Sequence, residues 1–415
     1  MHRLLAVGFS LAFFTASSQS ITTPYSNFGI GEFNGINMPN QIGMAGVGVS
    51  TPNLYYINIE NPALLTYNVL TSFQVGVTGD FRSYSTANQR ASDATASISH
   101  MVISIPLITN RWTSAVSLLP YSSVNYDIAS ASLIENSSDS VTNFFSGSGG
   151  LSQVSWSHGF RVGKFLSVGL RASYIFGSTT KNIINAIKPS DVVSTYRINY
   201  EESASYSDII FSASAAFKNK LGEGSFLHYG LVYDFQGSLS GELTENLRRL
   251  TINDVPISAY TINEDEAVSF QLPSRLSFGM TYERLNQTMV GVDVELLQWQ
   301  GAQEENAELK NTLNVAVGAQ ITPDYKDVNN YFKRVDYRFG ISYSQLPYIV
   351  NQSEINEIGI NFGVSFPTKN FSSVDGGFEF GSRGSTDNNL LRENFAQITF
   401  GLTINDRWFI KRRYD

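Results

Sequence analysis

The 415-residue sequence contains no cysteine, and only 15% of its residues are charged. Without cysteine the chain can form no disulfide and cannot carry a lipid on an N-terminal cysteine, so it is not a lipoprotein. Acidic residues outnumber basic ones, 36 to 28, which gives a net charge of −8. Because the basic residues are scattered until the last few positions, the composition argues against nucleic-acid binding.

Long apolar runs are also missing. Residues 1–18 read as a secretory signal peptide, with His2 and Arg3 ahead of an apolar stretch at 4–14 and small residues before the predicted cleavage. A buried N-terminal strand is the alternative interpretation of this stretch, which is too short to span a bilayer as a helix. After it the sequence has no run of 18 apolar residues, so a mature protein in a membrane would have to be a closed β-barrel.

What the sequence does contain is an alternation of apolar residues with polar or very small ones, at a period of two. In 166–176, for example, Leu166, Val168 and Leu170 alternate with Ser167, Gly169 and Arg171. About fourteen segments fit this pattern: 69–84, 96–106, 112–122, 150–162, 165–179, 205–217, 225–238, 270–283, 287–299, 310–321, 332–344, 354–366, 371–382 and 394–404.

The connections between these segments alternate in length. The short ones are 107–111, 163–164, 218–224, 284–286 and 367–370. The longer ones, predicted as polar loops, are 85–95, 123–149, 180–204, 239–269, 300–309, 345–353 and 383–393. Tight turns at one end and long loops at the other are typical of outer-membrane barrels. The sequence therefore predicts an all-β protein, a transmembrane antiparallel β-barrel of about fourteen strands over residues 69–404, in the outer membrane of a Gram-negative bacterium.

The two faces of the predicted strands differ in character. Charged residues at inward positions are assigned to the lumen, since on a lipid face each would cost about 2–4 kcal/mol at the midplane: Arg161, Arg171, Arg275, Asp293, Glu295, Asp336 and Arg338. Aromatic residues near strand ends are predicted to form interfacial girdles against outer-membrane lipids and lipopolysaccharide: Tyr174, Phe176, Tyr233, Phe235, Tyr282, Trp299, Tyr337 and Tyr343. Residues 405–415 are predicted to be a basic periplasmic tail.

Residues 19–68 do not alternate, and we predict that they form a hatch that plugs the barrel from the periplasmic side. The lumen of a barrel with about fourteen strands is too wide for its own wall side chains to fill. Gly43, Gly46 and Gly48 permit backbone conformations closed to other residues, whereas Pro62 fixes the junction between hatch and first strand. This segment is therefore predicted to gate the lumen, with a static plug as the alternative.

Three stretches resemble the FadL family of long-chain fatty acid channels. Gly43-x-Ala45-Gly46 followed by Asn61-Pro62-Ala63 is similar to the family's hatch. The stretch from Leu272-Pro273 to Asp293-x-Glu295-x-x-x-Trp299 looks like a family hairpin, and Arg338-x-Gly340-x-x-Tyr343 resembles a strand that follows it. The resemblance implies a monomeric fourteen-strand barrel with an N-terminal hatch that takes up hydrophobic small molecules and releases them sideways through its wall.

The resemblance leaves two functions open. Passive uptake of fatty-acid-like compounds is the first, and a carboxylate head group would then be bound by Arg161, Arg171, Arg275 or Arg338. The long connections hold few apolar clusters, however, and some FadL-like barrels are non-transporting subunits of secretion or assembly complexes, which is the second. The acidic run Glu264-Asp265-Glu266 is interpreted as solvated loop charges, with cation bridging to lipopolysaccharide as the alternative.

No catalytic, cofactor or metal site is predicted. His100, His158 and His228 are isolated on separate predicted strands and have no clustered ligands. The stretch 146–150, Ser-Gly-Ser-Gly-Gly, matches the spacing of a nucleophile elbow but is interpreted as a flexible loop because no strand-turn-helix surrounds it. The sequence thus favours a membrane channel or subunit over an enzyme.

Overall fold

The computed structural model describes residues 23–35, 38–86, 89–133, 139–188, 196–299, 309–350, 352–368, 371–387 and 390–408. The predicted signal peptide and residues 409–415 of the predicted tail lie outside this part of the chain. Among the described residues, no helix is long and apolar enough to cross a membrane.

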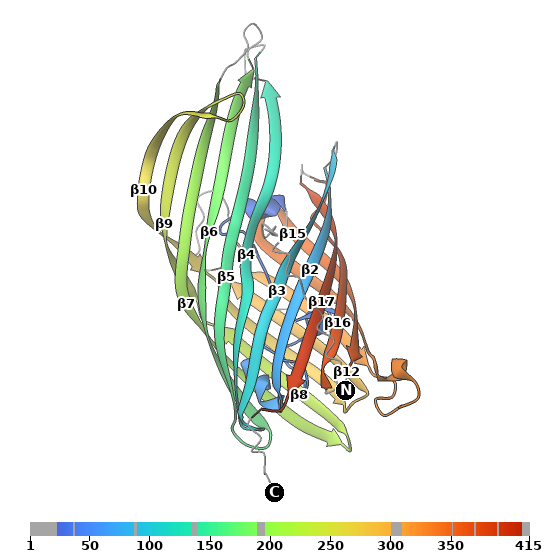
Figure 1. Cartoon of the computed structure of the whole chain (residues 1–415). Coiled ribbons are helices and arrows are strands. Elements are labelled where there is room, and N and C mark those ends of the chain that lie inside the picture. Colours follow the sequence, from blue (N-terminus) through green and yellow to red (C-terminus); the bar gives the residue numbers. More distant parts are fainter. Residues whose placement is uncertain are drawn as a thin grey trace, which may run out of the picture.

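Sixteen antiparallel strands, β2 to β17, form one sheet that closes on itself (Figure 1). The closure is made by the last strand pairing with the first along its whole length, from Asp406 opposite Thr71 to Arg392 opposite Ser85. The strands are β2 (Thr71–Ser85), β3 (Arg90–Ile108), β4 (Trp112–Leu133), β5 (Ser140–Arg161), β6 (Leu166–Lys188), β7 (Tyr196–Gly222), β8 (Ser225–Asp234), β9 (Gly237–Thr251), β10 (Pro256–Leu272), β11 (Ser274–Arg284), β12 (Thr288–Gln298), β13 (Thr312–Ile321), β14 (Asp336–Val350), β15 (Ser353–Pro367), β16 (Ser373–Arg383) and β17 (Arg392–Asp406).

Two of the wall positions are each filled by two strands in succession. Lower β7 pairs with β8 and upper β7 with β9, so β8 and β9 are two parts of one interrupted strand. In the same way β11 pairs with β8 and β10 with β9, and Pro273, which has no N–H to donate, separates β10 from β11. Sixteen strands therefore occupy fourteen positions, which confirms the predicted fold and strand number.

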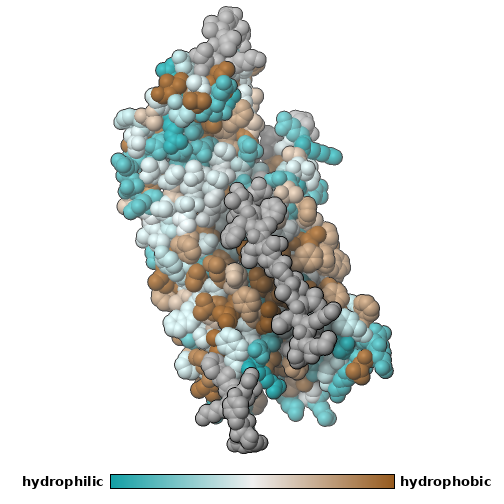
Figure 2. Space-filling view, viewed as in Figure 1, coloured by the Kyte–Doolittle hydropathy of each residue, from teal (hydrophilic) through white to brown (hydrophobic). Residues whose placement is uncertain are grey.

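The outer face carries an apolar band. Lipid-facing side chains such as Leu170, Phe211 and Phe278 are exposed, and Figure 2 shows such residues gathered over the middle and lower wall. An outward apolar band of this kind is the membrane-facing belt expected of an outer-membrane barrel. We call the end of the barrel with the short turns periplasmic and the opposite end extracellular. The predicted girdle is wrong at Trp299, which is 4% exposed and packs edge-on against the inner Phe33 ring at 5.5 Å.

The predicted long loops at 123–149, 180–204 and 239–269 are mostly strand. β6 and β7 run for 23 and 27 residues, whereas about 9–11 suffice to span a bilayer. The extracellular ends of β4 to β7, together with β9 and β10, thus rise as a tall sheet above the apolar band (Figure 1). The stretch 146–150, interpreted as a flexible loop, lies within β5, and the acidic run at 264–266 lies within β10. Water bathes both faces there, so nothing enforces the hydropathy alternation that marks a strand in the membrane.

The wall is split on its extracellular half. β3 and β4 are paired only near the periplasmic end, where Met101–Ile108 of β3 lie opposite Trp112–Leu118 of β4. Above that level the residues from Arg90 to Ser97 pair with β2 alone, and β3 and β4 diverge (Figure 1). We call this opening the β3–β4 seam.

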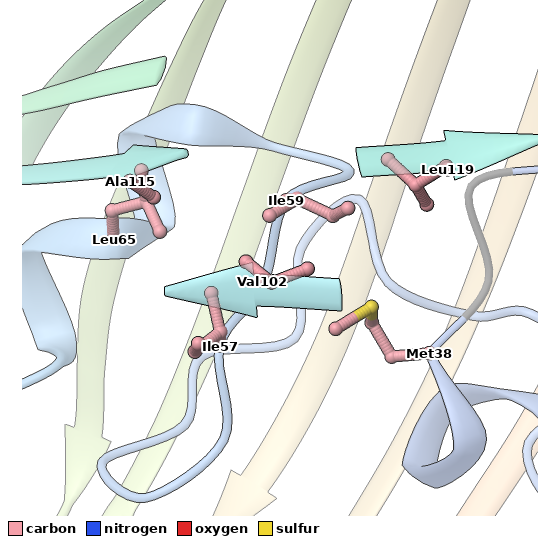
Figure 3. Close-up of a cluster of buried hydrophobic side chains, with 7 residues drawn as sticks. All are labelled: Met38, Ile57, Ile59, Leu65, Val102, Ala115 and Leu119. Atoms are coloured by element: carbon pink, nitrogen blue, oxygen red, sulfur yellow. The ribbon is translucent and has the colours of Figure 1, made fainter. Parts of the chain in front are cut away.

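Residues 23–35 and 38–67 lie on the inner faces of the strands; we call them the N-terminal segment. They contain the short elements η1 (Pro24–Asn27), β1 (Glu32–Phe33), α1 (Pro39–Ile42) and η2 (Pro62–Tyr67). A further 3-10 turn, η3 (Tyr331–Arg334), lies in the connection between β13 and β14. Figure 3 shows Met38, Ile57, Ile59 and Leu65 of the segment against Val102 of β3 and Ala115 and Leu119 of β4, all of them buried.

Candidate functional site

The extracellular end of the N-terminal segment fills part of the β3–β4 seam by pairing with the edge of β4. Phe33 is opposite Ser122 in an antiparallel register. Backbone hydrogen bonds of 2.9 Å run from Thr23 N to Asn125 O and from Asn34 N to Tyr121 O. Because β4 has no β3 partner at this height, the segment satisfies edge groups that would otherwise be open.

Glycines on the inner face of the wall let the segment touch the strand backbones. A Cβ on Gly230 would lie 1.9 Å from Val49 O, and one on Gly318 would lie 2.4 Å from Met44 O. Such distances leave no room for any side chain, so these positions require glycine if the segment is to stay where it is. The wall glycines with contacts of this kind are Gly159, Gly169, Gly230, Gly279, Gly318, Gly340, Gly363 and Gly377. Several face one another across neighbouring strands, as Gly230 and Gly279 do.

The three hatch glycines predicted from the sequence have different reasons to be glycine. Gly46 has φ of 85°, in the left-handed region that disfavours side chains. Gly43 has an ordinary helical φ of −60°, but a Cβ on it would lie 2.6 Å from Gly363 Cα. For Gly48 the obstacle is the side chain of Gln41, since a Cβ on Gly48 would lie 2.2 Å from Gln41 Nε2. Lack of room for a side chain, rather than a need for unusual backbone angles, therefore explains the glycines at positions 43 and 48.

The Asn-Pro-Ala stretch anchors the periplasmic end of the segment. Asn61 is fully buried and caps η2: its side-chain oxygen accepts from Ala63 N at 3.0 Å. Its Nδ2 donates to Val49 O at 2.7 Å, and Pro62 occupies the first turn. The Ala63 N–H also reaches Ser214 Oγ on β7 at 3.1 Å, which fixes the stretch to the wall.

A cluster of ion pairs, the Arg383 cluster, ties β1 to three wall strands. Glu32 lies 2.5 Å from Arg383 Nη2 and 3.7 Å from Arg82 Nη1. The same two arginines contact Glu393 of β17, whose carboxylate also accepts from Thr23 Oγ1. Burial opposes ionisation of Glu32, but attraction by Arg383 and Arg82 outweighs it and lowers its pKa from 4.5 to about 2. The cluster therefore holds the segment by charge.

A second cluster, the Arg275 cluster, lies deeper in the lumen. Arg275 contacts Glu60 of the N-terminal segment at 2.8 Å, together with Asp234 at 2.5 Å and Glu295 at 2.9 Å from the wall. Arg171 shares Asp234 at 2.8 Å and donates to Ile59 O at 2.9 Å. Two of the four predicted head-group arginines are thus brought together, and both are engaged by carboxylates of the chain.

The other two predicted arginines lie apart from this cluster. Arg338 is buried and donates to Gln320 at 2.7 Å and Ser365 at 2.5 Å, with Asp336 at 3.1 Å. Arg161 donates weakly to Thr66 O at 3.4 Å and stacks over the Tyr67 ring at 4.9 Å. All four point inward, but the structure does not gather them into one site.

A cavity of about 480 Å³ is lined by residues of both clusters. Its charged lining includes Glu32, Arg82 and Arg383 of the first cluster and Glu60, Arg171 and Arg275 of the second, together with Asp293. Asp293 accepts from Gly48 N and Val49 N on one oxygen, at 2.7 and 2.9 Å. Apolar side chains such as Phe33, Leu272 and Trp299 line the same cavity, so its wall combines charged and apolar groups.

Sequence reasoning missed the residues of the Arg383 cluster. Asp80 and Arg82 occupy inward positions of β2, alternating with Gly79 and Phe81, so the period of two could have placed them in the lumen. Asp80 pairs with Arg82, but the other partners of Arg82, Glu32 and Glu393, come from elements more than 300 residues apart, and no local pattern predicts that meeting. Among the described residues, no group of three or more metal-ligating side chains is arranged to hold an ion.

A family model named BamG matches residues 1–415. The chain belongs to the BamG family. A comparison with curated proteins gives no match. The barrel is similar in fold to solved FadL-type channels, which confirms the predicted FadL-like fold, although the family itself is BamG. With the fold and the family established, this BamG family member is an outer-membrane protein, as predicted.

Three solved structures illustrate the likeness in fold. The CymD monoaromatic hydrocarbon channel has a TM-score of 0.58 at 15% identity over 90% of this chain and 99% of its own. A Pseudomonas aeruginosa FadL homologue has a TM-score of 0.58 at 13% identity, over 90% and 98%. The Ralstonia pickettii toluene transporter TbuX has a TM-score of 0.57 at 13% identity, over 90% and 99%. At these identities the likeness concerns the fold.

Proposed function

We propose that this protein is a non-transporting subunit of an outer-membrane secretion or assembly complex. The observation that carries the proposal is the way the lumen is filled. The N-terminal segment is bound to the wall at both ends, by β pairing to β4 and by the capped Asn61-Pro62 junction, with ion pairs between them. Attachment of the segment to the wall at so many points supports a scaffold, and the family name BamG favours the same interpretation.

The state of the predicted head-group arginines also supports a scaffold. Arg171 and Arg275 are neutralised by Asp234, Glu60 and Glu295. A fatty-acid carboxylate would have to displace these partly buried partners, and removing one member of such a cluster leaves a charge without its partner, which destabilises the protein. The tall extracellular sheet, by contrast, offers a large surface outside the membrane for another subunit.

Uptake of small hydrophobic compounds is the second candidate, favoured by the fold it shares with hydrocarbon channels. In that case the segment bearing Gly43, Gly46 and Gly48 would move about the Asn61-Pro62-Ala63 junction. The β3–β4 seam would then be the side exit. This candidate requires the ion pairs of Glu32 and Glu60 to break during transport.

Purification of the full-length protein from outer membranes in a mild detergent tests the two candidates. A scaffold is expected to co-purify in stoichiometric amount with another outer-membrane polypeptide and to be silent in planar bilayers. A channel is expected to purify alone and to carry detergent or fatty acid in its lumen. The scaffold proposal fails if the isolated chain is monodisperse and speeds hydrocarbon entry into liposomes.

Deletion of residues 24–60, with the leader and Asn61 onward retained, serves as the control for the bilayer measurement. If the N-terminal segment seals the lumen, the truncated barrel folds and conducts more than the intact protein. If it folds and conducts no more, the segment does not occlude the lumen, and silence of the intact protein no longer supports the proposal.

A further inference from the structure

β10 is the outermost strand of the tall extracellular sheet, and one of its edges is open (Figure 1). Among the described residues, Pro256–Leu272 pair with β9 alone. The base of the strand is covered, since Leu272 joins an apolar cluster with Ile30. From residue 256 to 269 almost every side chain is exposed on both faces, so this stretch is a single layer whose second backbone edge pairs with none of the described residues.

This edge stands outside the bilayer. β10 and β11 occupy the same wall position, and Leu276 is the first lipid-facing residue of β11. Tyr260 of β10 lies 16 residues before Leu276 in the chain. At about 3.3 Å per residue that is roughly 50 Å along the strand, against an apolar band about 25 Å tall. Strand tilt shortens the height but leaves Tyr260 well above the headgroups. Lipid chains therefore cannot cover it.

Apolar side chains nevertheless cluster near the tip. Ile257, Tyr260 and Ile262 are 49%, 69% and 46% exposed, and Ile252 and Val255 lie in the turn before them. Apolar residues grouped on a surface in contact with water mark an interaction site. The unpaired N–H and C=O groups of the edge are matched by one kind of partner, another extended polypeptide.

The charge of the edge restricts that partner. Residues 256–272 contain Glu264, Asp265 and Glu266 but no Lys or Arg. Register shifts surround these acids, and Asp265 has φ of 52°. Acidic residues and bulges are devices that keep an edge from pairing with its own copy, because like charges would meet. A basic segment meets no such obstacle.

We propose that the extracellular edge of β10, residues 256–269, binds an extended basic segment of a partner polypeptide as an additional strand. Main-chain hydrogen bonds supply the affinity, the apolar residues at the tip bind alternate side chains of the partner, and the acids at 264–266 select for Lys or Arg. This inference deepens the proposed function and rests on it, since it says where the complex partner docks.

Hydrogen exchange on the co-purified complex and on the isolated chain tests the proposal. Pairing should slow amide exchange of residues 256–269 at least tenfold in the complex. Residues 90–97 of β3, which also lack a partner on one edge among the described residues, serve as the internal control and should not change. If a complex forms but 256–269 exchange as fast as in the isolated chain, the docking site is wrong while the proposed function survives. If no complex forms, both fail.

Charge reversal adds a second readout. The triple variant Glu264→Lys, Asp265→Lys, Glu266→Lys should reduce retention of the partner at least tenfold, with the barrel's heat-modifiable gel mobility unchanged. Asp93→Lys, a reversal on an exposed residue of β3, should retain the partner. Equal retention by the triple variant and by Asp93→Lys would overturn the charge assignment. Protection of 256–269 by a second copy of this chain would overturn the proposed partner.

Discussion

Single atoms decide whether the N-terminal segment fits against the wall, and Gly230 is the tightest point. We expect Gly230→Ala to push Val49 away, because the added carbon would lie 1.9 Å from its carbonyl oxygen. Overpacking of this kind costs about 1–3 kcal/mol. Faster proteolysis within residues 23–67 and higher bilayer conductance would report it. Gly222→Ala is the matched control, because nothing lies within 4 Å of its Cβ position. Identical behaviour of the two variants would contradict this account.

Also at the residue scale, the lowered pKa of Glu32 predicts that acid weakens the attachment of the N-terminal segment to the wall. Its pKa in the folded protein, about 2, lies below the ordinary 4.5 because Arg383 and Arg82 outweigh the effect of burial. The attraction is therefore complete above pH 4.5 and is lost as pH falls towards 2. A fluorophore on Asn34→Cys should become more accessible to a quencher across this window.

Glu32→Gln provides the comparison for that experiment. It should be more accessible at neutral pH and change less between pH 4.5 and 2 than the unmodified protein does. If Glu32→Gln and the unmodified residue give the same profile, the two arginines do not hold the segment through Glu32.

At the scale of elements, β1 acts as a strand that partly closes the β3–β4 seam. Phe33 and Ser122 are directly opposite each other, and such neighbours lie about 4.5–5.5 Å apart at Cα, within the range a disulfide spans. The double variant Phe33→Cys, Ser122→Cys should therefore oxidise readily, and no native cysteine competes. Closing this loop should stabilise the barrel by up to about 4 kcal/mol and raise its unfolding temperature. Failure to crosslink in the folded barrel would mean that β1 does not stay on β4.

The whole molecule consists of a membrane-spanning barrel and a tall extracellular sheet that share strands. We expect the barrel to survive removal of Glu242–Ala267 with an Asn-Gly turn in their place, because β8 keeps β7 and β11 as partners. The new turn would join Gly241 and Val268, which are already opposite each other. Heat-modifiable mobility should persist, with the unfolding temperature lowered by only a few degrees, while the partner is lost. A variant that does not insert into the membrane would show that the two parts fold together.

The alternation of hydropathy is sufficient to predict the barrel and its fourteen positions, and the inward placement of Arg171, Arg275 and Arg338. Lipid on one side of the wall enforces that alternation, so it can be read from neighbouring residues. Outside the bilayer both faces of β9 and β10 meet water, and the same backbone ladder continues without the pattern. For that reason the sequence predicts a loop over residues 239–269, although they form two strands.

The sequence by itself determined where strands cross the membrane. In each crossing strand alternate side chains face lipid and lumen, and this requirement is visible in neighbouring residues. Only the tertiary structure decided what those side chains meet. Glu32 reaches Arg383, and Glu60 reaches Arg275, across 351 and 215 positions of the chain. Such pairs depend on closure of the sheet and on strand register, and so do the open edge of β10 and the seam beside β4. These are global properties that no stretch of neighbouring residues encodes.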